Sequence, residues 1–279
     1  MLSTKFVTVA VDEWYQHRQK DAEGVFYRDV VYQGPRGKIP DATTQGLYAF
    51  RSDGKLLGFT NHRSPDRIRA MLEKSLKDFT PPEETATAAA GKPDATFVRT
   101  LPEGGLVADV TSKVLGGYGE PKNEWQKVAQ AALGRDHLWI RKDEADALTR
   151  GELADSLKLR IARFHFVDNT RGEPPMWTKA EVKALEMTVK EGVIAGRVHL
   201  EAGDRGFVAS IRGAIEVKDG KVTRFDLVAK GEFWGQGTYT QGAPAGKFPF
   251  AVALGLAEGK AVADKVPPQG SRDLRDYLK

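Results

Sequence analysis

The feature that most constrains the fold is the stretch 181–234, in which apolar and polar residues alternate in four successive runs. Successive side chains of a β-strand point to opposite faces, so this alternation is typical of strands that are buried on one face. Short turn sequences separate the runs, and Asp219-Gly220 favours a two-residue hairpin with positive φ at both positions. The stretch therefore predicts a four-stranded antiparallel meander over 185–190, 193–201, 207–218 and 224–233.

The composition excludes several classes of function. The chain contains no cysteine, which excludes disulfides, thiol nucleophiles and cysteine-ligated metal. Lys and Arg number 42 against 38 Asp and Glu, and because these charges are interspersed along the chain we do not expect a nucleic-acid partner. No apolar run approaches the ~20 residues of a membrane-spanning helix. The first residues do not resemble a signal peptide, so we expect a soluble protein whose compartment the sequence leaves open.

Three segments are expected: a small α/β unit (1–79), a Pro-, Ala- and Thr-rich linker (80–96), and an α+β domain on a curved antiparallel sheet (97–279). The expected strands of the first segment are 6–11, 46–50 and 56–59, with helical structure at 13–33, broken around Gly24, and from Ser64-Pro65 to 79. In the third segment we expect further strands at 97–101, 106–115, 137–140, 157–167 and 248–254, helices at 120–133 and 142–148, and a peripheral tail at 267–279.

The first unit resembles the C-terminal half of a thioredoxin-like domain. The resemblance rests on Tyr48 to Phe50, the hairpin sequence Ser52-Asp53-Gly54-Lys55-Leu56-Leu57 and the helix at 65–79, with 6–11 as the strand after the family's active-site helix. The family's Cys-x-x-Cys has no counterpart here, and Gln45 stands near the place of the family's cis-proline. The resemblance thus implies a redox-inactive, partial unit with an open sheet edge. Another segment of the chain, or a second copy in a homo-oligomer, would protect this edge. The alternative is an unrelated βαββα unit.

The segment 163–177 carries the densest group of functional side chains, running from an expected strand end into a polar loop. It offers an anion clamp, carboxylates and a stacking surface, so the candidate ligand-binding residues are Arg163, Asp168, Arg171, Glu173 and Trp177. In the structural interpretation of the same residues, 168–170 forms a capped turn, Arg171 pairs with Glu173, and Trp177 fills the core. If 157–167 is a strand, its alternation places Arg163 and His165 on the same face as apolar residues. Either a β-bulge near Ala162 changes which face the later residues occupy, or both faces of the strand are covered and the two polar side chains enter a polar cavity.

Three histidines of the expected strands are candidate ligands of a divalent metal, namely His137, His165 and His199. No His-x-His or His-Glu-x-x-His pattern supports this site, and a solvated His199 is the structural interpretation.

Besides a subunit whose incomplete N-terminal sheet is completed by a partner, two functions remain. The first is a non-redox binding or scaffold protein that holds a small molecule or a protein on a concave surface of the C-terminal sheet. The second is a metal-binding protein or metal-dependent enzyme that uses His165 with His199 or His137, and Asp168 or Glu173. No motif in the sequence fixes a reaction.

Overall fold

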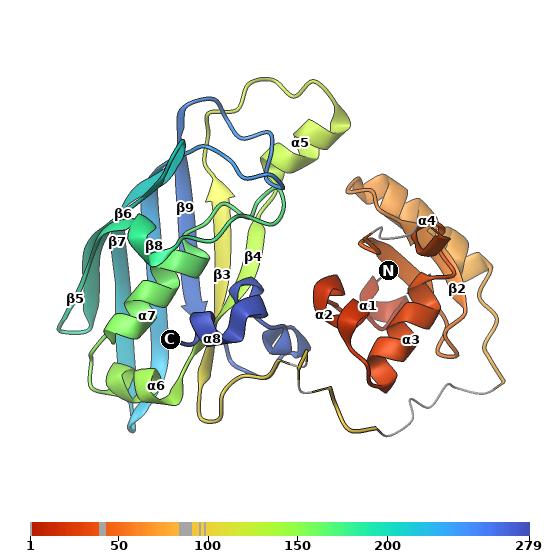
Figure 1. Cartoon of the computed structure of the whole chain (residues 1–279), viewed down its shortest axis with the longest axis horizontal. Helices are drawn as coiled ribbons and strands as arrows, with labels where there is room; N and C mark the ends of the chain where they lie inside the picture. The colour runs from red at the N-terminus through yellow and green to blue at the C-terminus, as the bar shows by residue number, and fades with distance from the viewer. Residues whose placement is uncertain (1, 39–42, 84–90, 95, 98) are drawn as a thin grey trace. The chain divides into compact units, whose positions relative to one another are not determined.

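The computed structural model describes residues 2–38, 43–83, 91–94, 96–97 and 99–279. The chain divides into two compact units, Met1–Arg99 and Thr100–Lys279, each described by itself (Figure 1). Within the predicted linker, residues 84–90 and 95 lie outside the described residues.

Unit 1 is a set of short helices with one antiparallel hairpin, β1 (Leu47–Phe50) and β2 (Leu56–Thr60). The turn between them contains Gly54 at φ 86°, a conformation that glycine adopts without strain. The helix α4 (Pro65–Lys77) has proline in its first turn, as predicted, and packs on the hairpin. Gly58 permits this close approach, because a Cβ there would lie 2.4 Å from Ser75 Oγ. The remaining helical segments are α1 (Leu2–Lys5), α2 (Glu13–Arg18), α3 (Ala22–Val31) and η1 (Pro35–Lys38).

The predicted strand at 6–11 was wrong, because the structure has no strand there and leaves Val7 and Val9 largely exposed. A β-branched run is typical of a buried strand, but no strand in the described part of unit 1 pairs with this one. Gly24 lies inside α3, and the break in the helical region comes at 19–21 instead. The thioredoxin-like resemblance therefore rests on the hairpin and α4, and stays a prediction.

Unit 2 is built on one seven-stranded antiparallel sheet with the strand order β4-β3-β9-β8-β7-β6-β5. The strands are β3 (Leu106–Val114), β4 (Gly134–Ile140), β5 (Val182–Lys190), β6 (Val193–Ala202), β7 (Arg205–Lys218), β8 (Lys221–Trp234) and β9 (Lys247–Leu256). The helical segments are α5 (Glu124–Ala131), α6 (Lys142–Thr149), α7 (Asp155–Arg160), the π-helical turn η2 (Ile161–His165), η3 (Lys179–Glu181), η4 (Val262–Lys265), η5 (Gln269–Asp273) and α8 (Leu274–Tyr277). The mixed α+β class expected from the sequence is confirmed.

The predicted meander is confirmed as β5 to β8, with each strand paired to the next along the chain. Asp219 and Gly220 have φ values of 52° and 70°, as a type I′ hairpin requires. Glu191 and Gly192 have φ values of 52° and 76° in the turn between β5 and β6.

The sheet is strongly curved, as predicted. The turn η2 contacts both β4 and β5, which are the two edge strands. Six spacings of about 4.8 Å would separate these edges by about 29 Å in a flat sheet. One helical turn reaches both edges only because the strands curl around it, and Figure 1 shows α6 and α7 on this inner side.

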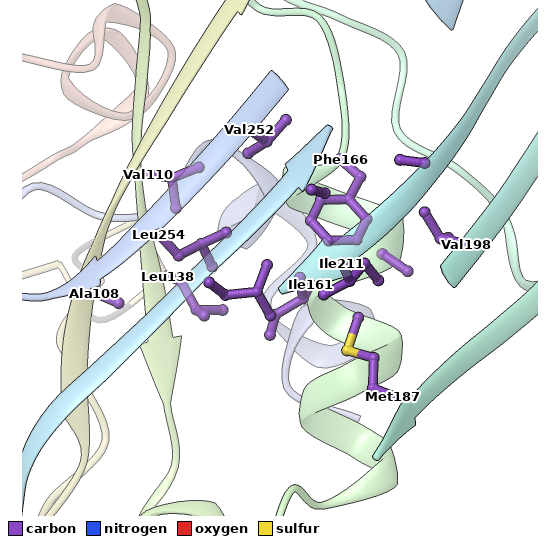
Figure 2. Packing of buried hydrophobic residues seen from close by; sticks show 14 of the residues in the cluster. Ala108, Val110, Leu138, Ile161, Phe166, Met187, Val198, Ile211, Val252 and Leu254 are labelled. Carbon is purple, nitrogen blue, oxygen red and sulfur yellow. The ribbon is translucent and has the colours of Figure 1, made fainter. Parts of the chain in front are cut away.

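The concave face holds the main hydrophobic core. Alternate residues of the strands point into it and meet apolar side chains of α6, α7 and η2. Figure 2 shows Leu138, Ile161, Phe166, Ile211 and Met187 directed toward this common interior. The expected concave ligand surface is therefore corrected, since the protein's own core occupies that side.

Several local predictions were wrong for identifiable reasons. Segment 157–167 lies in α7, η2 and the two residues after them, and does not form a strand. Because residues 160–168 are all buried, apolar and polar residues do not alternate there with the 3.6-residue period that identifies a helix buried on one face. Neither residues 99–101 nor residue 97 forms a strand, while residue 98 lies outside the described part of the chain. The helix expected at 120–133 is limited to α5, and Gly134 begins β4.

Pro249 does not place β9 at an edge. Its carbonyl accepts a hydrogen bond from Leu115 N at 2.8 Å, just beyond the last residue of β3. Both backbone polar positions of a strand residue face the same neighbour. The position of the missing N–H therefore faces the chain just after the end of β3. No hydrogen bond of the β3–β9 ladder is lost, so a central strand tolerates this proline.

Candidate functional site

The predicted ligand loop is anchored at both ends by Arg163 and Trp177. The Nε of Arg163 donates a hydrogen bond to the Trp177 carbonyl at 2.9 Å, and its Nη1 and Nη2 donate to the Asp276 carboxylate at 3.1 and 2.6 Å. The indole Nε1 of Trp177 donates to the Phe166 carbonyl at 2.9 Å. The hydrogen bonds from Arg163 also lower the pKa of Asp276. Both anchor side chains are buried, so they close the loop on itself.

Asp168 and Arg171 form a buried ion pair at 2.5 Å, and it connects three loops at one end of the sheet. Arg171 also donates to the Thr240 carbonyl at 3.0 Å and to the Tyr118 hydroxyl at 2.8 Å. Asp168 accepts from the backbone and hydroxyl of Thr170 at 3.1 and 2.6 Å. Burial raises the pKa of Tyr118.

These contacts give the loop an internal role. Four of the five predicted ligand residues are buried and hydrogen-bonded to the protein itself, while Glu173 is exposed and pairs with Arg272. A guanidinium whose donors already bind protein acceptors, as in Arg163 and Arg171, offers little to an external anion. This geometry agrees with the alternative in which the loop residues stabilise the fold and bind no ligand, although Arg171 pairs with Asp168 instead of Glu173.

His165 is buried beside the C-terminal segment. Its Nε2 lies 2.8 Å from the Tyr277 hydroxyl, and its Nδ1 lies 3.2 Å from Asp136 Oδ2 without forming an aligned hydrogen bond. Burial, with the nearby Asp136 charge, raises the pKa of Tyr277 well above its usual value. The Asp–His–Tyr arrangement therefore holds a protonated phenol and provides no activated nucleophile.

The same region protects the open edge of β4. Trp139 N donates to the Tyr277 hydroxyl at 3.2 Å, and its carbonyl accepts from Arg160 at 3.2 Å. Arg160 forms a buried ion pair with Glu144 at 2.5 Å and donates to the Tyr277 carbonyl at 2.6 Å. Side chains thus replace a neighbouring strand at this edge.

The tail was expected to be peripheral, which was wrong, since Tyr277 is buried and completes this network. The spacing of Leu274, Tyr277 and Leu278 was the sequence signal for a buried helical face. Nothing in the sequence pairs Glu144 with Arg160 or Asp136 with His165.

The three candidate metal-ligating histidines are not brought together. His137 lies on β4 and His199 on β6, and four strands separate these two in the sheet. Their strands are five spacings apart, about 24 Å in a flat sheet. His199 is half exposed and lies 3.3 Å from Glu201, whereas His165 is held by Tyr277. The prediction of one site with all three ligands is therefore corrected.

His137 has two other potential co-ligands. It faces Asp109 across the β3–β4 pair, with His137 Nε2 3.4 Å from Asp109 Oδ1. Asp264, in η4, completes a group whose ligand atoms all lie within 4.8 Å of one another. Imidazole and carboxylate ligands suit zinc and other first-row transition metals. The sequence did not indicate Asp264, which is far from His137 along the chain.

The convex face of the sheet is exposed over the strands β5 to β8 and across β9 and β3. Its side chains belong to the strand positions that alternate with the core positions. Salt bridges join Glu186 to Arg197 at 2.7 Å and Arg224 to Glu216 at 2.8 Å. At the β3–β4 corner of this face, Val107 and Trp139 are buried against Phe164 and Tyr277, whereas the helices α6 and α7 lie on the concave side and leave the rest of the face open.

Comparison with models of protein families, with curated proteins and with solved structures finds no match to this chain. Among the described residues, no helix is both long and apolar enough to cross a membrane.

Proposed function

We propose that this protein is a non-redox binding protein that holds its ligand on the convex face of the C-terminal sheet. The observation that supports this most directly is the asymmetry of the sheet. The concave face is filled by the core, while the convex face presents a regular array of exposed side chains. The absence of cysteine leaves no thiol for redox exchange.

The rigidity of the platform also supports a binding role. The strands β3 and β5 to β9 are each 9 to 14 residues long. The buried hydrogen-bond network around Tyr277 also fixes the β4 edge. A surface held by a hydrogen-bonded sheet loses little conformational entropy when a partner binds.

The test uses the lack of native cysteine, because a single introduced thiol can carry a photo-cross-linker. We compare Ser210→Cys, on the convex face, with Lys221→Cys, an exposed control at the β7–β8 turn. We expect a discrete cross-linked product in an extract of the native cells from position 210 and none from position 221. Equal products from both positions, or no product from either, would contradict the proposal.

A second candidate function is metal binding, and the group Asp109, His137 and Asp264 favours it. Two carboxylates approach each other here, and the His137 imidazole lies beside one of them, with Nε2 3.4 Å from Asp109 Oδ1. A bound divalent cation would relieve the repulsion between the carboxylates and tie η4 to the sheet.

Elemental analysis after incubation with zinc and dialysis tests the second candidate. We expect about one equivalent in the native protein. His137→Ala should lose the metal, while the matched control His199→Ala should keep it, because Glu201 is the one carboxylate near His199 among the described residues. Retention of zinc by His137→Ala, or no uptake by the native protein, would reject this site.

A further inference from the structure

The convex face carries a group of cations that no run of the sequence reveals. Lys113 on β3, Arg135 on β4, Arg212 on β7 and Lys230 on β8 are all exposed. None of the four has a carboxylate within ion-pairing distance among the residues that the structure describes. We call these four residues the cationic band.

The strand register places the band in two adjacent rows. In one row, Arg212 faces Val228, which faces Ala253, followed by Thr111 and Arg135. In the other row, Ser210 faces Lys230, followed by Ala251 and Lys113. With about 4.8 Å between strands and about 7 Å between rows, Lys230 and Lys113 originate about 10 Å apart on either side of β9.

The residues that β9 places between the cations are short. β9 contributes Ala251 and Ala253 to this face, so the backbone there is covered by little more than methyl groups. An extended chain lying along β9 would meet Lys230 on one side and Lys113 on the other. Side chains of such a chain repeat every two residues, at about the 7 Å spacing of the rows.

We propose that the cationic band binds an acidic, extended polypeptide segment of a partner protein, an inference that rests on the proposed function of the convex face. The unpaired cations supply charge complementarity, which steers and orients an anionic partner. A flexible acidic segment can follow a convex surface and place a carboxylate at each cation in turn.

The shape and composition of the band favour a polypeptide over nucleic acid. A duplex is itself convex and would contact only part of a curved face. Single-stranded nucleic acid is usually held by aromatic side chains on which bases stack, and the band contains none. Trp234, an aromatic residue of β8 on this face, is covered by the Lys247 ammonium, whose Nζ lies 4.7 Å from the ring centroid.

The experiment measures fluorescence anisotropy of a labelled deca-glutamate peptide with the full chain at low salt. The test variant is Lys113→Glu/Lys230→Glu. The matched control is Lys218→Glu/Lys221→Glu, which changes the net charge equally at two exposed residues paired across the β7–β8 turn. We expect the test variant to weaken binding about tenfold or more, a loss of about 1.4 kcal/mol or more, and the control to weaken it less than about twofold. Binding should also weaken as salt is added.

Three outcomes would overturn the inference: no binding of the peptide, equal loss in both variants, or tighter, band-dependent binding of a decamer of single-stranded or duplex DNA. The last outcome would identify nucleic acid as the partner. If Ser210→Cys still gives its site-specific cross-link while one of these outcomes is found, the convex face remains the proposed binding surface. Only the acidic polypeptide segment is then rejected as its partner.

Discussion

The buried hydroxyl of Tyr277 gives the sharpest test of the network at the β4 edge. Tyr277→Phe keeps the ring but removes the acceptor of Trp139 N and the partner of His165 Nε2. Leaving a buried polar group without its partner costs about 1–3 kcal/mol. Because loss of the hydroxyl's own desolvation offsets part of this cost, we expect unit 2 to lose about 2 kcal/mol of unfolding free energy. For a unit of this size the melting temperature should fall by about 4–8 °C.

Thermal unfolding followed by circular dichroism and urea unfolding followed by tryptophan fluorescence measure this loss. The matched control is Tyr239→Phe, because Tyr239 is 73% exposed. We expect the control to stay within about 0.5 kcal/mol of the native protein. If Tyr277→Phe shifts the transition no more than Tyr239→Phe, the hydroxyl does not hold the edge, and the C-terminal segment is peripheral after all.

Three further predictions follow from other contacts. Glu144→Ala should destabilise unit 2 by about 3–5 kcal/mol in urea unfolding, since it leaves the Arg160 guanidinium buried without its carboxylate; a loss below about 1 kcal/mol would show that water reaches this pair. Asp276→Asn should cost about 1 kcal/mol or less at pH 7, because this carboxyl is partly exposed. The pKa of Asp276 is lowered in the folded state, so its ion pair stabilises the fold above the unfolded pKa of about 4, and this stabilisation is lost as the pH falls further. The unfolding free energies of Asp276→Asn and the native protein should therefore converge at low pH. A difference that stays constant with pH would exclude the charge as its cause. If a second copy protects the β1–β2 hairpin edges, size-exclusion chromatography with light scattering should give a dimer, whereas a monomer counts against it.

The sequence predicted the meander well because its strands are buried on one face and its turns have specific chemistry. Alternation in 185–190 and 207–218 identifies both the strand and its core face, and Asp219-Gly220 sets the hairpin. The prediction was wrong at 157–167 for the opposite reason. That segment is enclosed by the curved sheet on several sides, so its buried residues follow no simple period.

The candidate sites show the same limit. The loop residues Asp168 and Arg171 are close in sequence, so their local pairing was within reach of sequence reasoning. Whether they face solvent or the interior depended on Tyr118 and Thr240, which come from two other loops.

The sequence alone determined the α+β class, the meander with its hairpin turns, the helix α4, and the exclusion of thiol chemistry. Each of these depends on neighbours within a few residues or on composition. Only the tertiary structure decided that the concave face is filled, that the tail closes the β4 edge, and that Lys113, Arg135, Arg212 and Lys230 lie together. These features depend on strand order and register, which bring together residues far apart along the chain, 138 positions in the case of Trp139 and Tyr277, and no local pattern encodes that pairing.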